Sequence, residues 1–127
     1  MTDAKPNYEK LEIWQEAMAL TKIIYLKTKD YPKEEKFGIT DQVRRAGLSV
    51  ALNIAEGAGR GSKADFRRFL LIAKGSLNEV LTLFTLSLEI GLISSKEYDD
   101  IRSMVLRLMR RIQALISKLQ DFPSSKP

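Results

Sequence analysis

The feature that most constrains the fold is a helical repeat of apolar residues in four long stretches, separated by segments that carry proline or glycine. In each stretch apolar residues recur every three or four positions, which places them on one face of an α-helix. No stretch shows the strict alternation of apolar and polar residues that is typical of a half-buried strand. The four predicted helices cover residues of about 11–29, 40–58, 63–90 and 95–121.

The ends of these stretches carry helix-terminating signals. The residue before Pro32 is pushed out of the helical conformation, which closes the first helix. We expect Thr40 to cap the second helix and the glycines between Gly57 and Gly61 to end it. Gly91 should terminate the third helix. Two pairs have the three-residue spacing of a capping box, namely Ser62 with Asp65 and Ser94 with Glu97.

Four amphipathic helices joined by short turns predict an all-α fold, an antiparallel up-and-down four-helix bundle. The chain of 127 residues is long enough to bury a core and suits one domain, residues 1–127. The link from residue 30 to 39 should fold over one end of the bundle, with Phe37 tucked inward. The first helix is expected to turn one face to the core, formed by Leu11, Trp14, Met18, Thr21, Tyr25 and Thr28, with Ala17 and Ile24 beside them.

The absence of cysteine and histidine excludes most familiar catalytic chemistry. No thiolate nucleophile, zinc finger, haem ligand or histidine general base can be built from this chain. A di-metal site of the ferritin type needs histidine as well. Its carboxylates are expected to be surface partners or caps, among them Glu12, Glu16, Glu79 and Glu89. We therefore expect no enzyme activity, no cofactor and no metal.

The sequence carries no targeting signal that we recognise. The first residues are polar and lack the apolar run of a signal peptide. No stretch of about 18 consecutive apolar residues occurs, so we expect no membrane partner. The expected compartment is the cytoplasm.

The fourth helix carries a basic face. From residue 101 to 120 the sequence has basic residues and no acidic one: Arg102, Arg107, Arg110, Arg111 and Lys118. Four of these, all but Arg102, fall within about 100° of arc on a helix. Guanidinium groups suit phosphate oxygens, so a linear array of this kind could follow a nucleic-acid backbone. The alternative is an ordinary solvated helix face.

A second basic group follows the glycine-rich turn, namely Arg60, Lys63, Arg67, Arg68 and Lys74. The turn leads into the N-terminus of the third helix, where free backbone N–H groups can bind an anion. The spacing is not that of a Walker loop. The alternative is a plain connection between two helices.

Polar residues interrupt the small apolar surface of the second helix: Arg44, Arg45, Asn53 and Glu56. Either they contact nucleic acid, or they form an interhelical or intersubunit hydrogen-bond network that sets the register of the helices. We favour the network.

The third helix has a second apolar stripe beside its core stripe, formed by Ile72, Leu83, Leu86 and Ile90. This stripe indicates either a subunit interface or a central helix with neighbours on both sides.

Several segments resemble one bacterial family. They are LEIWQEA at residues 11–17, YPKEEKFGI at 31–39, QVRRAGLSVALNIAEGAGRGSKADFRRF at 42–69 and IAKGSLNEV at 72–80. Together they are similar to the bacterial four helix bundle protein family, also called the 23S rRNA intervening-sequence protein family. The chain departs from the family pattern at Ala51, where the family usually has proline, and at Gly47, where alanine is common. The second helix should therefore be straighter.

The resemblance implies a helical bundle that assembles as a ring-like homopentamer. Some members are encoded inside insertions in large-subunit ribosomal RNA genes. Related accessory proteins of retroelements share the fold, bind nucleic acid and bind a reverse transcriptase. The resemblance carries no catalytic residues to this chain.

The residues and the resemblance together support two readings. In the first, an oligomeric bundle binds structured RNA or DNA by phosphate contacts, and a net charge of +5 per chain attracts polyanions. In the second, the bundle is a protein-interaction scaffold that docks a partner such as a reverse transcriptase, and its basic surface steers that encounter.

Overall fold

The computed structural model describes residues 7–120 of the chain. Two short 3₁₀ helices, η1 at Asn7–Lys10 and η2 at Lys33–Glu35, flank the first long helix. The four long helices are α1 at Glu12–Thr28, α2 at Ile39–Ala58, α3 at Lys63–Glu89 and α4 at Ser95–Leu119.

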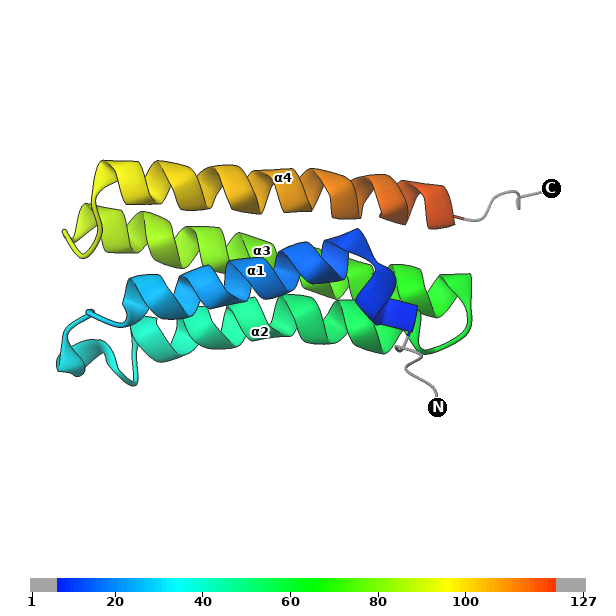
Figure 1. Cartoon of the computed structure of the whole chain (residues 1–127), viewed down its shortest axis with the longest axis horizontal. Helices are drawn as coiled ribbons and strands as arrows, with labels where there is room; N and C mark the ends of the chain where they lie inside the picture. Colours follow the sequence, from blue (N-terminus) through cyan, green and yellow to red (C-terminus); the bar gives the residue numbers. More distant parts are fainter. Residues whose placement is uncertain (1–6, 121–127) are drawn as a thin grey trace.

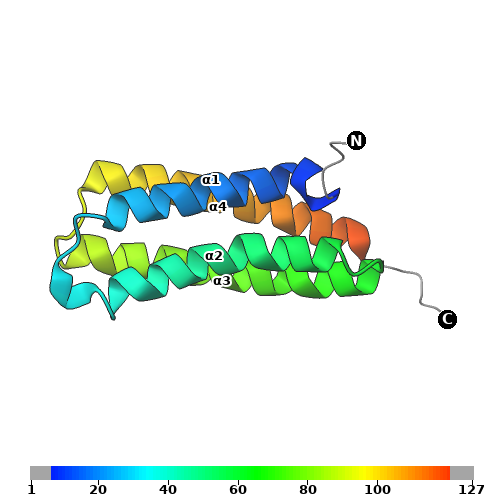
Figure 2. The ribbon, with the colours of Figure 1, turned by 60° about the horizontal axis from the view of Figure 1, so that its bottom comes forward.

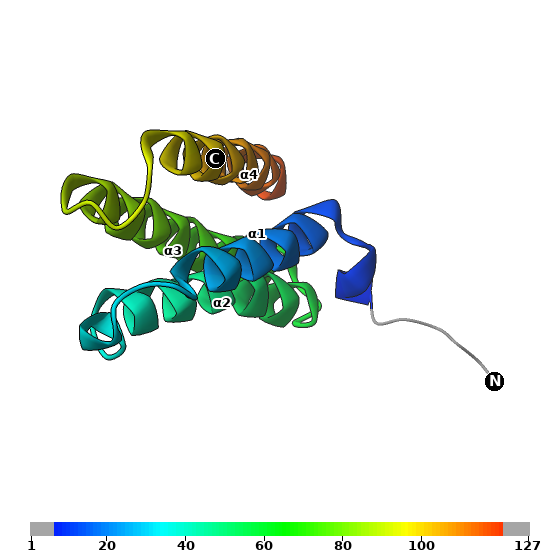
Figure 3. The same ribbon diagram turned by 60° about the vertical axis from the view of Figure 1, so that its left-hand side comes forward.

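The four helices lie side by side, and each runs antiparallel to the one before it (Figures 1 and 2). The prediction of an all-α bundle is confirmed. The most extensive packing joins α2 to α3, whereas α1 and α4 share the least. Figure 3 shows α4 lying over α3 and set apart from the crossing of α1 and α2. The seam between α1 and α4 is therefore the most lightly packed in the bundle.

One apolar core runs the length of the bundle and draws on every long helix. Its largest fully buried side chains include Phe84 and Leu77 on α3, Ile24 on α1, Ile54 on α2 and Ile112 on α4. Each helix contributes residues three or four positions apart, because that spacing returns a side chain to the same face. Burial of these side chains is the main force that orders the helices.

The predicted helix-terminating signals of α3 and α4 are present. The Ser62 hydroxyl accepts a hydrogen bond from the Asp65 N–H at 3.1 Å. Ser94 and Glu97 form a full capping box, with distances of 3.0 and 3.1 Å. Gly91 ends α3 with a φ of 81°, a conformation that suits glycine because it has no Cβ.

The buried face of α1 differs from the predicted one. Met18 and Tyr25 are 37% and 41% exposed, whereas Leu20 and Ile13 are buried. The core face is centred on Ala17 and on the residues one turn away from it. Thr21, Thr28, Ala17 and Ile24 are buried as predicted. The prediction was wrong for Met18 and Tyr25, because two apolar stripes lie next to each other on this helix and only packing against α2 and α4 selects one of them.

Two predictions near the first link were also wrong. Gly38, not Thr40, precedes the first residue of α2, and Thr40 lies buried inside the helix. Phe37 is 85% exposed and does not tuck inward. A short 3₁₀ turn at η2 takes the link outward, and the Glu35 carboxylate, not Thr40, accepts a hydrogen bond from the Ile39 N–H at 3.3 Å. The predicted end of the fourth helix at Asp121 lies outside the described residues.

The third helix is unusually apolar. Within residues 7–120, α3 is the one helix long and apolar enough to cross a membrane by length and composition alone. A third of its most apolar stretch is buried in the bundle. The rest of that stretch gives α3 an outer face with few charges. The expectation of no membrane partner stays a prediction.

Candidate nucleic-acid interface

Of the four basic residues predicted to share one face of α4, three make no ion pair among the described residues. Arg107, Arg110 and Lys118 are all exposed. Within residues 7–120, none of the three has a carboxylate partner at salt-bridge distance. They extend over about 16 Å of helix at 1.5 Å per residue. We call these three residues the α4 basic face.

Arg111 lies beside this face but is engaged by α1. Its guanidinium donates one hydrogen bond to the Glu16 carboxylate and another to the Glu12 carboxylate. The hydrogen bond to Glu12 is the main reason that the pKa of Arg111 lies above its usual value. Glu12 and Glu16 lie on one side of α1 because they are four positions apart. Arg111 is thus a tie across the lightly packed seam.

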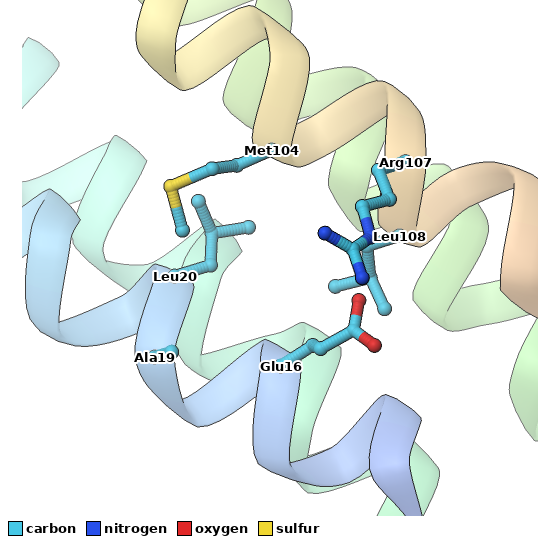
Figure 4. Close-up of a pocket in the computed structure, with 6 residues that line it drawn as sticks. All are labelled: Glu16, Ala19, Leu20, Met104, Arg107 and Leu108. Carbon is cyan, nitrogen blue, oxygen red and sulfur yellow. The ribbon is translucent and has the colours of Figure 1, made fainter.

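A small pocket of about 160 Å³ lies in the same seam. Leu20 and Leu108 form its apolar wall, and Met104 reaches over it from α4 (Figure 4). In the same view the Arg107 guanidinium points toward the Glu16 carboxylate. The acidic side of α1 therefore faces both arginines on this side of α4.

The other end of the seam carries a second tie between α1 and α4. The Lys27 ammonium donates to the Glu97 carboxylate at 3.2 Å. Glu97 also accepts from the Ser94 N–H, and this backbone hydrogen bond is the main cause that lowers its pKa. Ion pairs thus hold α1 to α4 near both ends of the seam.

A pocket of about 420 Å³ beside this second tie includes Tyr31, Leu92 and Ile93. The Tyr31 hydroxyl is buried and has no hydrogen-bond partner among residues 7–120. Burial raises the pKa of Tyr31.

Two residues of the basic group after the glycine-rich turn, Arg60 and Arg68, are paired with acids. Arg60 pairs with Glu56 at 2.9 Å, and Arg68 pairs with Asp65 at 3.2 Å. Both guanidinium groups lie over the ring of Phe69, at 5.0 and 4.6 Å from its centre. The charges of Arg60 and Arg68 are therefore engaged within the junction between α2 and α3.

The remaining basic residues of that group point in different directions. Lys63 is exposed, and the Nε of Arg67 is buried without a hydrogen-bond partner among residues 7–120. Lys74 donates to the amide oxygen of Gln113 at 2.6 Å and so links α3 to α4. The structure therefore does not bring this group together as one surface.

Arg44 joins α2 to α1. Its Nε donates to the Thr28 hydroxyl at 2.9 Å, and its guanidinium lies 4.6 Å from the centre of the Tyr25 ring. This geometry supports an interhelical role for Arg44.

The other polar residues of α2 make separate local contacts. Arg45 pairs with Asp41 on its own helix at 3.0 Å. Asn53 donates to Ser49, whose hydroxyl receives a hydrogen bond from Ser76 on α3 at 2.8 Å. The pairs of Arg45 and Glu56 are local, whereas Asn53 joins α3 through Ser49 and Ser76. Within the described residues these contacts do not form one network.

The predicted second stripe of α3 is partly exposed. Ile72, Leu86 and Ile90 are 44%, 42% and 50% exposed, and Leu71 adds another 44%. On α2, Leu52 is 64% exposed. A depression of about 560 Å³ lies beside this stripe, between α3 and α4, and includes Leu86, Tyr98 and Arg102. We call the exposed apolar residues of α3 and of its C-cap (Leu71, Ile72, Leu86 and Ile90) the α3 outer face.

No group of three or more acidic side chains in the described part of the chain is placed to hold a metal ion.

The family described as 23S rRNA-intervening sequence protein matches residues 9–114. The chain belongs to this family. The match extends from η1 to within the last turns of α4, so nearly all of the bundle is family structure. Comparison with curated proteins finds no match.

A solved structure from Bacteroides thetaiotaomicron has a similar bundle. It is described as a protein of unknown function from the S23 ribosomal protein family. It is 23% identical, and the alignment covers 82% of this chain and 97% of that one, with a TM-score of 0.74. At this identity the likeness supports the fold alone. The helix α2 of this chain runs without a break through Ala51.

Sequence reasoning placed the basic residues of α4 but not the acids that meet them. The sequence predicts that Glu12 and Glu16 are surface partners or caps, but it does not indicate which basic residue they pair with. The four-residue spacing of these acids was the available signal, because it gives α1 an acidic edge. Which helix that edge faces is decided by packing.

Proposed function

We propose that this protein is a non-enzymatic, self-associating bundle that binds structured RNA or DNA through the phosphate backbone. The observation that carries the proposal is the α4 basic face. Arg107, Arg110 and Lys118 are exposed and unpaired within the described residues, on a stretch of helix that holds no acid. A duplex presents several phosphates over the length of such an array.

The proposed mode of binding is recognition of charge and shape. The sequence of α4 from residue 101 to 119 contains no aromatic side chain on which an unstacked base could lie. Phosphate contacts position a protein on nucleic acid without reading its sequence. We therefore expect little preference for base sequence.

The experiment is a titration of a labelled RNA hairpin and a matched DNA duplex at several salt concentrations. The test variant is Arg107→Gln/Arg110→Gln/Lys118→Gln. A matched control, Lys22→Gln/Lys29→Gln/Lys33→Gln, removes the same charge from exposed positions on α1 and the first link.

Loss of three phosphate contacts should flatten the plot of log affinity against log salt by about 0.9 per contact. The control should leave this slope nearly unchanged. Equal effects of the two variants would mean that the α4 basic face is not the binding surface.

The self-association part of the proposal rests on the α3 outer face. Exposed apolar patches are typical of interfaces, and this face has two of them, Leu71 with Ile72 and Leu86 with Ile90. The stretch from Gly75 to Leu88 contains only one charged residue, Glu79. A second copy would cover this surface, and the expected assembly is a ring-like pentamer.

Light scattering of Leu86→Ser/Ile90→Ser tests the assembly. We expect the mass to fall toward that of one chain, 14.4 kDa. Leu26→Ser is the control, because Leu26 is 65% exposed on α1, outside the α3 outer face. A monomeric wild-type protein would contradict this part of the proposal.

The alternative function is a scaffold that docks another protein, such as a reverse transcriptase. The α3 outer face favours it, because an apolar surface suits a protein partner better than a phosphate backbone. An oligomer that binds neither RNA nor DNA at low salt would favour this alternative.

A further inference from the structure

Arg111 is the one arginine of the predicted α4 array that another helix neutralises within residues 7–120. Its side chain is 34% exposed, so solvent and ligands can reach it. Glu16 is 27% exposed and Glu12 is 72% exposed. The ion pairs of Arg111 are therefore partly exposed to solvent, at the edge of the α4 basic face.

Glu16 also lowers the charge that the neighbouring Arg107 presents. Glu16 lines the seam pocket with Arg107, and their charged ends point toward each other (Figure 4). Two carboxylates on α1 thus face two arginines on α4. Only Arg110 and Lys118 lie clear of them.

We propose that Glu12 and Glu16 determine the specificity of the α4 basic face by acting as internal competitors of a phosphate ligand. This inference rests on the proposed function. A phosphate group reaches Arg111 only if it replaces hydrogen bonds from the guanidinium to two carboxylates. One phosphate in solution has no further contact to offset that loss.

A nucleic-acid duplex differs because its phosphates are linked. Phosphates held by Arg110 and Lys118 bring the next ones near Arg111 at a high effective concentration. Arg111 then joins the interface only when several neighbouring phosphates are already bound. The acids of α1 therefore select densely charged polyanions over isolated phosphates.

The test compares two variants of the full chain that lose the same negative charge. Glu12→Gln/Glu16→Gln removes the two carboxylates that pair with Arg111, one of which also faces Arg107. Glu34→Gln/Asp99→Asn changes the net charge equally at exposed positions, one in η2 and one in the first turns of α4. Binding of an RNA hairpin and of a matched DNA duplex is measured from 50 to 200 mM salt.

We expect Glu12→Gln/Glu16→Gln to bind about three- to tenfold tighter than the matched control at 50 mM salt, with a salt slope steeper by about one phosphate contact. Inorganic phosphate at constant ionic strength should inhibit binding by Glu12→Gln/Glu16→Gln more than binding by the wild type. A merely structural tie would change neither readout. The RNA and DNA arms show which duplex the released face prefers.

Equal affinities and slopes for the two variants, with a wild type that binds, would overturn this inference and leave the proposed function standing. Failure of all variants to bind would overturn both. Binding by Glu12→Gln/Glu16→Gln alone would support the competition and would show that the acids block the wild-type face. If the double variant unfolds, Glu12→Gln alone is used. It removes one of the two competing carboxylates, and Glu16 still links α1 to Arg111.

Discussion

The Cα of Gly57 on α2 faces Phe69 on α3 so closely that a Cβ placed on Gly57 would lie 2.7 Å from the Cβ of Phe69. The backbone oxygen of Phe66 would lie 3.3 Å from the Cβ placed on Gly57. Neither neighbour is the flexible end of a side chain. The most extensive helix contact of the bundle thus depends at this point on the absence of a side chain.

Gly57→Ala should destabilise the protein by about 1–3 kcal/mol, because overpacking forces the two helices apart. Gly75→Ala should do the opposite by about 1 kcal/mol, because alanine favours a helix interior and nothing lies within 4 Å of the added Cβ. Urea unfolding of both variants at one protein concentration measures the difference. Equal stabilities would contradict the close approach at Gly57.

Thr40→Val should stabilise the protein by about 1 kcal/mol. The Thr40 hydroxyl is buried and lacks a hydrogen-bond partner among residues 7–120, so its removal relieves a desolvation cost. Thr28→Val is the matched control and should be destabilising. The Thr28 hydroxyl donates to the Ile24 carbonyl at 2.8 Å and accepts from Arg44. Thermal unfolding ranks the two variants, and the reverse order would refute the assignment of both hydroxyls.

Arg44→Gln should lower stability by about 1 kcal/mol and leave nucleic-acid affinity nearly unchanged, because its guanidinium is engaged by Thr28 and Tyr25 on α1. Arg45→Gln removes the same charge one residue away, from a side chain that is 77% exposed and paired within its own helix. It should change stability by less than about 0.5 kcal/mol. A large loss of binding for Arg44→Gln alone would assign it to the interface instead.

Glu97 should make the bundle sensitive to acid. Hydrogen bonds from Ser94 and Lys27 hold the pKa of Glu97 below its usual value of about 4.3. The carboxylate therefore stabilises the folded state above that range, and the stabilisation is lost as the pH falls through the lowered pKa. Urea unfolding from pH 6 to pH 3 should show a smaller loss of stability for Glu97→Gln than for the wild type. Parallel curves would exclude Glu97 as a source of the acid sensitivity.

Much of the fold could be predicted because it is written in short-range patterns. Residues such as Leu77 and Phe84 recur at helical spacing, and Ser94 with Glu97 carries its cap within four positions. The face of α1 could not be predicted in the same way. Leu20 and Met18 are both apolar, and the choice between them depends on where α2 and α4 lie.

The same distinction between local patterns and packing holds for the candidate site. The basic residues of α4 follow from the sequence, because charge and helical period are local properties. Their state does not, since Arg110 is free whereas Arg111 is paired within the described residues. The partners of Arg111 lie 95 and 99 positions away.

The sequence by itself determined four helices, the caps of α3 and α4, a glycine-marked turn and a basic fourth helix. Each of these depends on backbone conformation and on side chains within about one turn of each other. Only the tertiary structure decided that Phe37 points outward, that Gly57 meets Phe69, and that α1 sets Glu12 and Glu16 against Arg111. The position of Phe37 depends on how the link folds at η2, and the other two relationships depend on how each helix is rotated about its axis. That rotation is set by the packing of all four helices at once, and no local pattern contains it.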